Sequence, residues 1–301
     1  MKKIGKILLL ILITGVLYPM ENTKEITLNG KTYRFYEKDL LYGSGSYSDV
    51  FWRGILAEDT VLKLGKNEMV LAKKTELCFY YSGKPAYGYL AEETALKLGD
   101  QIFQFGKKTR IDFSENETVI KGYLAEDQEI KIGSALFLFK KGVQEYEDIE
   151  FYENGKIKLG FLAKNTSVKI GKNSYLLFKG IGFYPSGKID YGHLAENTQA
   201  WVGKNQIILA GSEYHSVAFY EDGSLMGATL AEDQEIKAGN LFIPLTSQVS
   251  FSKEGNLTRG VLAKPFVFKN QTYPQFKTIV LQYDEDQNEL IDIKIFKYPE
   301  R

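Results

Sequence analysis

Residues that could act as nucleophiles or metal ligands are scarce in this sequence. The chain has one cysteine, Cys78, and two histidines, His193 and His215, among 301 residues. A thiolate–imidazole pair is formally available, but Cys78 lies in an apolar run where a small buried hydrophobe is expected. Two histidines supply few ligands for zinc or copper. The sequence therefore predicts no catalytic residue, no metal site, no cofactor and no enzymatic activity.

Two short segments resemble ligand-binding motifs. Gly43–Phe51 resembles a kinase Gly-rich loop, with Lys63 at the position of the kinase strand lysine. No catalytic-loop or metal-binding motif of a kinase follows, and Lys63 is one copy of a repeated lysine. Asp284, Asp286 and Asn288 have the opening spacing of a calcium loop, but its glycine and its bidentate glutamate are missing. We interpret both segments as turns.

Paired acidic residues follow several of the predicted strands. Glu58-Asp59, Glu126-Asp127 and Glu232-Asp233 occupy equivalent corners of a repeat. Paired carboxylates can perform acid–base catalysis, but catalysis needs one non-equivalent site and these corners recur. The pattern therefore indicates solvated turns.

An aromatic pair recurs along the chain and has the potential to bind a ligand. Phe-Tyr occurs at Phe79, Phe151, Phe183 and Phe219. Neighbours in a strand face opposite sides, so we expect each Phe in the core and each Tyr in a ladder on the other face. The predicted ladder consists of Tyr80, Tyr152, Tyr184 and Tyr220. Such a ladder can stack on sugar rings or on a partner protein, or can only stabilise cross-strand pairs.

These residues are positioned by an internal repeat. Leu-Ala-Glu or Leu-Ala-Lys begins at Leu56, Leu90, Leu124, Leu162, Leu194, Leu230 and Leu262, with spacings of 34, 34, 38, 32, 36 and 32. A Phe stands eleven residues before six of these leucines, and glycines recur at fixed offsets on both sides. A period near 34 is the signature of a repeat architecture.

Each repeat unit is predicted to be two β-hairpins. In Phe151–Ile157 an aromatic strand runs into Asn154-Gly155, which favours a tight hairpin turn. The return strand alternates apolar and polar residues up to Leu162, and a second strand pair follows a polar corner. No helical period is present, so the sequence predicts an all-β fold.

Residues 21–301 are predicted to form one array of about seven to eight units. We expect an open solenoid or elongated meander of tandem hairpins, with half-units at both ends acting as caps. A β-propeller is the alternative, because the two half-units could complete each other and close a ring.

The first 20 residues have the layout of a secretory signal. Lys2, Lys3 and Lys6 precede an apolar run from Ile7 to Tyr18, and the chain turns polar at Glu21. The run is short for a membrane span, and no clear cleavage site follows. We expect a signal peptide or an N-terminal membrane anchor, and hence export to the periplasm, the cell envelope or the medium.

The composition argues against nucleic acid as a partner. The 38 Lys and Arg residues balance 38 Asp and Glu residues, and only 5 of the cations are Arg. Nucleic-acid-binding domains carry a basic excess and favour Arg for phosphate and base contacts.

Phe151–Ile157, with its relatives at Phe183 and Phe219, resembles the variant MORN-type repeats of bacteria over about a third of each unit. Choline- or glucan-binding wall repeats are a more distant likeness. The resemblance implies stacked hairpins that contact a protein or a membrane surface, without catalytic residues. We expect a non-enzymatic exported protein with an extended interaction or scaffolding surface. A glycan or cell-wall binding module using the tyrosine ladder is the alternative.

Overall fold

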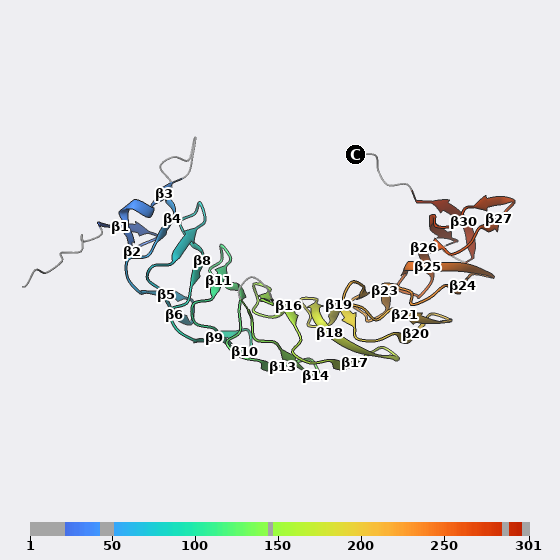
Figure 1. Cartoon of the computed structure of the whole chain (residues 1–301), viewed down its shortest axis with the longest axis horizontal. Helices are drawn as coiled ribbons and strands as arrows, with labels where there is room; N and C mark the ends of the chain where they lie inside the picture. The colour runs from blue at the N-terminus through green and yellow to red at the C-terminus, as the bar shows by residue number, and fades with distance from the viewer. Residues whose placement is uncertain (1–21, 43–50, 144–146, 285–288, 297–301) are drawn as a thin grey trace, which may run out of the picture.

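The protein is an open arc of antiparallel β-strands in two layers (Figure 1). A computed structural model describes residues 22–42, 51–143, 147–284 and 289–296. These residues form 30 strands and one short 3-10 turn, Glu37–Asp39, and they contain no α-helix. The all-β, open tandem-hairpin architecture predicted from the repeat is confirmed.

A continuous antiparallel sheet lies along the concave side of the arc (Figure 1). Its strands in spatial order are β3 (Leu41–Tyr42), β4 (Phe51–Ile55), β7 (Glu76–Phe79), β8 (Pro85–Tyr89), β11 (Arg110–Phe113), β12 (Val119–Gly122), β15 (Ile149–Phe151), β16 (Ile157–Phe161), β18 (Asn173–Phe183), β19 (Ile189–Leu194), β22 (Ser216–Phe219), β23 (Leu225–Thr229), β25 (Leu241–Phe251), β26 (Leu257–Leu262), β29 (Thr278–Tyr283) and β30 (Leu290–Ile295). We call it the inner sheet.

A row of separate hairpins covers the convex side. They are β1 (Thr23–Leu28) with β2 (Lys31–Tyr36), β5 (Thr60–Leu64) with β6 (Asn67–Leu71), β9 (Thr94–Leu98) with β10 (Gln101–Phe105), β13 (Gln128–Ile132) with β14 (Ala135–Phe139), β17 (Thr166–Ile170) with the start of β18, β20 (Thr198–Val202) with β21 (Asn205–Leu209), β24 (Gln234–Ala238) with the start of β25, and β27 (Phe266–Phe268) with β28 (Gln271–Tyr273). We call these the outer hairpins. The core of Phe, Leu, Ile and Tyr side chains lies between the two layers.

The two ends of the inner sheet do not meet. Strand β3 pairs only with β4, and β30 pairs only with β29, among the described residues. The far edge of β30 is capped by the last outer hairpin, because Tyr273 donates its hydroxyl proton to the Ile293 carbonyl at 2.6 Å. The propeller alternative was therefore wrong, and the array is open.

The Leu-Ala pair that begins each repeated Leu-Ala-Glu or Leu-Ala-Lys, which we call the marker, joins the two layers by backbone hydrogen bonds in every repeat. Each marker Leu pairs with the last core residue of the preceding outer hairpin, as in Phe35 with Leu56 and Phe105 with Leu124. The following Ala donates its N–H to the same hairpin, as in Ala57 to the Arg34 carbonyl at 2.8 Å. A backbone contact this regular explains why the marker keeps its register along the chain.

A glycine two residues before the marker leaves room for this junction. A Cβ atom on Gly122 would lie 2.5 Å from the Phe105 ring. The ring fills the space above the Gly122 backbone, so a side chain there would displace a buried aromatic.

The curvature follows from how each layer is joined. Inner strands are linked by backbone hydrogen bonds, so each repeat adds about 10 Å to that layer. Outer hairpins are joined by side-chain amides: Asn67 bridges the Lys97 carbonyl and N–H at 3.1 and 3.0 Å, and Asn205 bridges those of Lys237 at 3.1 and 2.8 Å. An inserted amide makes the outer layer longer per repeat, and the array bends towards the inner sheet.

Candidate functional site

One row of side chains crosses the whole concave face. Directly paired strand residues point the same way, and here they point away from the core. We call these residues the concave row: Arg53, Cys78, Tyr87, Asp112, Lys121, Glu150, Leu159, Gly182, Tyr191, Ala218, Gly227, Ser250, Arg259, Val280 and Lys294.

The N-terminal half of the concave row is charged and internally paired. Arg53 lies 2.6 Å from the Glu76 carboxylate, which also accepts a hydrogen bond from the Tyr87 hydroxyl. Burial and this bond raise the pKa of Tyr87. Arg110 pairs with Asp112 and its guanidinium carbon lies 3.8 Å from the Tyr87 ring centroid. Arg supports this dual pairing and stacking, which Lys does poorly.

Three consecutive members of the concave row, Ala218, Gly227 and Ser250, carry small side chains. Together with His215 they line a shallow depression of about 230 Å³. The Nδ1 atom of His215 is buried and has no hydrogen-bond partner among the described residues. This part of the row therefore offers space for a side chain of a partner.

Cys78 belongs to the concave row but is poorly suited to nucleophilic chemistry. Its side chain is buried, and burial raises the pKa of the thiol. A protonated thiol is a weak nucleophile.

The tyrosine ladder lies at the bases of the inner hairpin turns. The hydroxyls of Tyr80, Tyr152, Tyr184 and Tyr220 each donate to the carbonyl of the next repeat's core Phe, at 2.7, 2.8, 2.8 and 2.9 Å. The paired Phe residues are buried, as expected. The four hydroxyls are thus used in bonds between neighbouring repeats, and only the half-buried ring faces are left to contact a ligand. A ligand role for the ladder stays a prediction.

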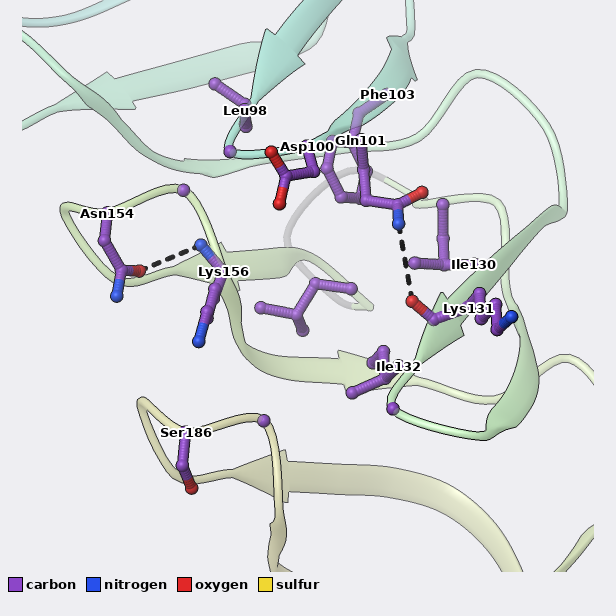
Figure 2. Close-up of a pocket in the computed structure, with 15 residues that line it drawn as sticks. Leu98, Asp100, Gln101, Phe103, Ile130, Lys131, Ile132, Asn154, Lys156 and Ser186 are labelled. Carbon is purple, nitrogen blue, oxygen red and sulfur yellow. Dashed lines mark hydrogen bonds between the residues drawn. The ribbon is translucent and has the colours of Figure 1, made fainter.

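The turns of both layers meet along one edge of the array and enclose repeated hollows. The first tip cavity, of about 390 Å³, is lined by residues 98–101, 103, 130–133, 154–157 and 186–187. Figure 2 shows Asp100, Lys156 and Ser186 around it, with the Lys131 side chain turned away. Gln101 donates to the Lys131 carbonyl at 3.4 Å.

The second tip cavity repeats this arrangement two units later. It has a volume of about 240 Å³ and is lined by residues 170–173, 201–203, 222–225 and 253–255. The core rings of the two units match: Phe103 packs edge-on against Phe151 at 4.8 Å, and the equivalent Tyr175 packs edge-on against Phe219 at 5.1 Å. Trp201, which is 47% exposed, takes the place of Lys131.

Aspartates of the acidic corners accept hydrogen bonds from backbone N–H groups. Asp59 accepts the Lys73 N–H and Asp127 accepts the Lys141 N–H, both at 2.7 Å. Lys63 pairs with Glu68 at 2.9 Å on the outer face. Most of the kinase-like stretch (residues 43–50) and two positions of the calcium-like spacing (286 and 288) lie outside the described residues, as does the N-terminal segment.

Within the described residues no helix is long and apolar enough to cross a membrane, and no cluster of three or more His, Cys, Asp or Glu side chains is arranged for a metal ion. No family model matches the chain, and a search of the curated proteins finds no match. The resemblance to variant MORN-type repeats stays a prediction.

Proposed function

We propose that this protein is a non-enzymatic scaffold of the bacterial envelope that binds an extended protein segment along its concave face. The observation that carries the proposal is the unbroken concave row, which places charged and small side chains on one curved surface. Curved repeat arrays use such surfaces for multi-contact binding.

Two parts of the row have complementary roles in this proposal. The charged part, Asp112 and Lys121, with Arg110 paired to Asp112, orients a partner through its fixed pattern of charge. The part with small side chains, at Ala218 and Gly227, leaves room for inserted side chains. Export is proposed from the basic and apolar N-terminal segment.

Photo-crosslinking tests the proposal. A photoreactive residue at Ala218 on the concave face should capture a defined partner in the cells that make the protein, and one at the exposed Val61 on the convex face should not. With the identified partner purified, Ala218→Trp should fill the depression and weaken binding at least about tenfold, or 1.4 kcal/mol. Val61→Trp is the matched control and should leave affinity unchanged. Equal capture from both faces, or none from Ala218, would refute concave binding.

A further inference from the structure

A line of lysines and exposed apolar side chains follows the middle of the convex side. The outer hairpins there are β9–β10, β13–β14 and β17 with the start of β18, at the lowest part of the arc in Figure 1. We call them the crest hairpins. On their outward face Lys97 pairs directly with Ile102, and Lys131 with Leu136. The Ile102 and Leu136 side chains are 56% and 54% exposed.

These two pairs continue into one another and into the next hairpin. Gln101 donates to the Lys131 carbonyl at 3.4 Å, which brings Ile102 beside Lys131 of the neighbouring hairpin. Lys169 occupies the equivalent outward position in β17. Cations and apolar side chains therefore alternate across neighbouring strands. We call these residues the crest row: Lys97, Ile102, Lys131, Leu136 and Lys169.

The fold does not require the apolar members of the crest row. The position held by Ile102 and Leu136 is polar in three other outer hairpins, as Glu68, Ser174 and Gln206. Those hairpins fold with a polar side chain there, so the core does not depend on an exposed Ile or Leu. Single exposed hydrophobics are ordinary, but hydrophobics that recur in neighbouring repeats between cations indicate an interaction surface.

The crest row carries a net positive charge. Glu129, the one acid on the outward face of the crest hairpins, pairs with Lys164 at 3.8 Å. Among the described residues, no carboxylate forms an ion pair with the three lysines of the crest row. The turns of the crest hairpins add Asp100 and Lys172, whose charges cancel. The three ammonium groups therefore remain available to an anionic partner.

The surface of an anionic bilayer matches both properties of the row. Lysine lays its aliphatic stem along apolar surface while its ammonium group reaches the headgroup phosphates. Apolar side chains beside such lysines enter the boundary between headgroups and acyl chains. Nucleic acid would neutralise the cations through its phosphates but would leave the apolar side chains in water. A fluid lipid surface also adapts to a convex crest without a matching groove.

We propose that the crest row binds the surface of a bilayer that contains anionic phospholipid. The ammonium groups of Lys97, Lys131 and Lys169 contact headgroup phosphates, and the Ile102 and Leu136 side chains enter the bilayer boundary. The concave face points to the opposite side of the arc and stays open to a partner (Figure 1). All five residues lie in the outer hairpins, whereas the segment that resembles MORN-type repeats lies in the inner sheet.

A fluorophore placed on the crest row tests this contact in the full-length chain. Cys78→Ser removes the native thiol, and Ile102→Cys then carries an environment-sensitive label. The probes are phosphatidylcholine vesicles with and without phosphatidylglycerol, each containing a nitroxide-labelled lipid as quencher. Phosphatidylglycerol vesicles should shift the label emission to the blue and quench it more strongly than phosphatidylcholine vesicles do. Lys97→Gln together with Lys131→Gln should weaken the contact at least about tenfold and so remove most of this quenching.

The matched control label is Phe242→Cys, at the same outward position opposite Lys237. Phe242 is 58% exposed, but its hairpin, β24 with the start of β25, lies towards the C-terminal end of the arc (Figure 1). A flat bilayer that touches the crest does not reach it, so this label should not be quenched. Both labels are read in the same full-length chain, so attachment through the N-terminal segment does not favour Ile102. Lys63→Gln together with Lys237→Gln should leave the quenching at residue 102 unchanged.

Three results would each overturn the proposal. They are no quenching of the Ile102 label by phosphatidylglycerol vesicles, equal quenching of the Ile102 and Phe242 labels, and undiminished quenching after Lys97→Gln with Lys131→Gln. If the Ile102 label instead responds only to a membrane-free cell extract, the crest row binds a soluble protein and the lipid assignment is wrong.

Discussion

The two tip cavities share one backbone design and differ in both chemistry and packing. The first has Lys131, Asn154 and Ser186 where the second has Trp201, Asp222 and Glu254. A few side-chain changes on the same turns thus replace Lys131 by an aromatic residue and two uncharged turn residues by carboxylates. The repeat supplies the enclosure, and individual substitutions change its chemistry.

In each cavity the two layers approach closely at one end only, at the N-terminal end of the first cavity and at the C-terminal end of the second. In the first, a Cβ on Gly155 would lie 2.2 Å from the Gly99 nitrogen, so the two layers touch backbone to backbone. In the second, the corresponding distance from Gly223 to the Gly171 nitrogen is 4.0 Å. The next pair reverses this order: Gly255 to Gly203 is 2.5 Å. Close layer contacts therefore do not recur in every repeat.

The largest expected effect comes from blocking a close contact. Gly155→Ala should destabilise the protein by about 3 kcal/mol, from a positive φ of 79° and a backbone clash. Gly187→Ala has the same kind of turn, with φ of 88°, but its Cβ would meet only Ile132 at 3.5 Å and should cost about 1 kcal/mol. Urea unfolding followed by circular dichroism measures both. Equal losses would mean that the layers do not touch at Gly155.

A smaller effect separates the amide clamps of the two cavities. Asn173→Ala removes two hydrogen bonds to Trp201 and should cost about 1–2 kcal/mol. Gln101→Ala removes one long bond to the Lys131 carbonyl and should cost less than about 0.5 kcal/mol. Urea unfolding measures both losses, and hydrogen exchange at the Trp201 amide, which donates to Asn173, reports the Asn173 clamp directly. A larger loss of stability in the Gln101 variant than in the Asn173 variant would contradict this ranking.

The smallest effect depends on pH. Burial raises the pKa of Tyr175 in β18, and Phe103 holds the equivalent position in β10. Because the folded pKa exceeds the unfolded value near 10, this stabilisation is complete below pH 10 and is lost as pH rises through the folded pKa. Hydrogen exchange between pH 9 and 11 should therefore accelerate in β17–β18 more than in β9–β10. Tyr175→Phe should abolish the difference.

Local patterns in the sequence predicted the repeat and the strands, because turn glycines and alternating apolar residues report local structure. Gly155 and its equivalents marked hairpin turns, and Phe151 and its equivalents marked the core. The order of the layers was not predictable. Where the chain passes from one layer to the other, a residue such as Lys74, Lys108 or Ser247 has a positive φ. Glycine is the usual residue in that left-handed conformation, so these positions could not be recognised from the sequence.

The candidate sites were less accessible from sequence. The tyrosine ladder was identified, but its hydroxyl contacts with the next repeat depend on the inter-repeat spacing. The tip cavities join turns two repeats apart, such as Gly99 with Gly155, and no local pattern encodes that contact. One signal was present: Trp201 replaces the periodic lysine, and alignment of the repeats would have found it.

The different joints in the two layers also give the arc a directional stiffness. Tightening the curve separates outer hairpins and opens side-chain amide bonds such as those of Asn67, at about 1 kcal/mol each. Straightening the curve either stretches the backbone ladder of the inner sheet or compresses the outer hairpins onto their amides. We therefore expect the arc to increase its curvature around a bound partner more easily than it straightens.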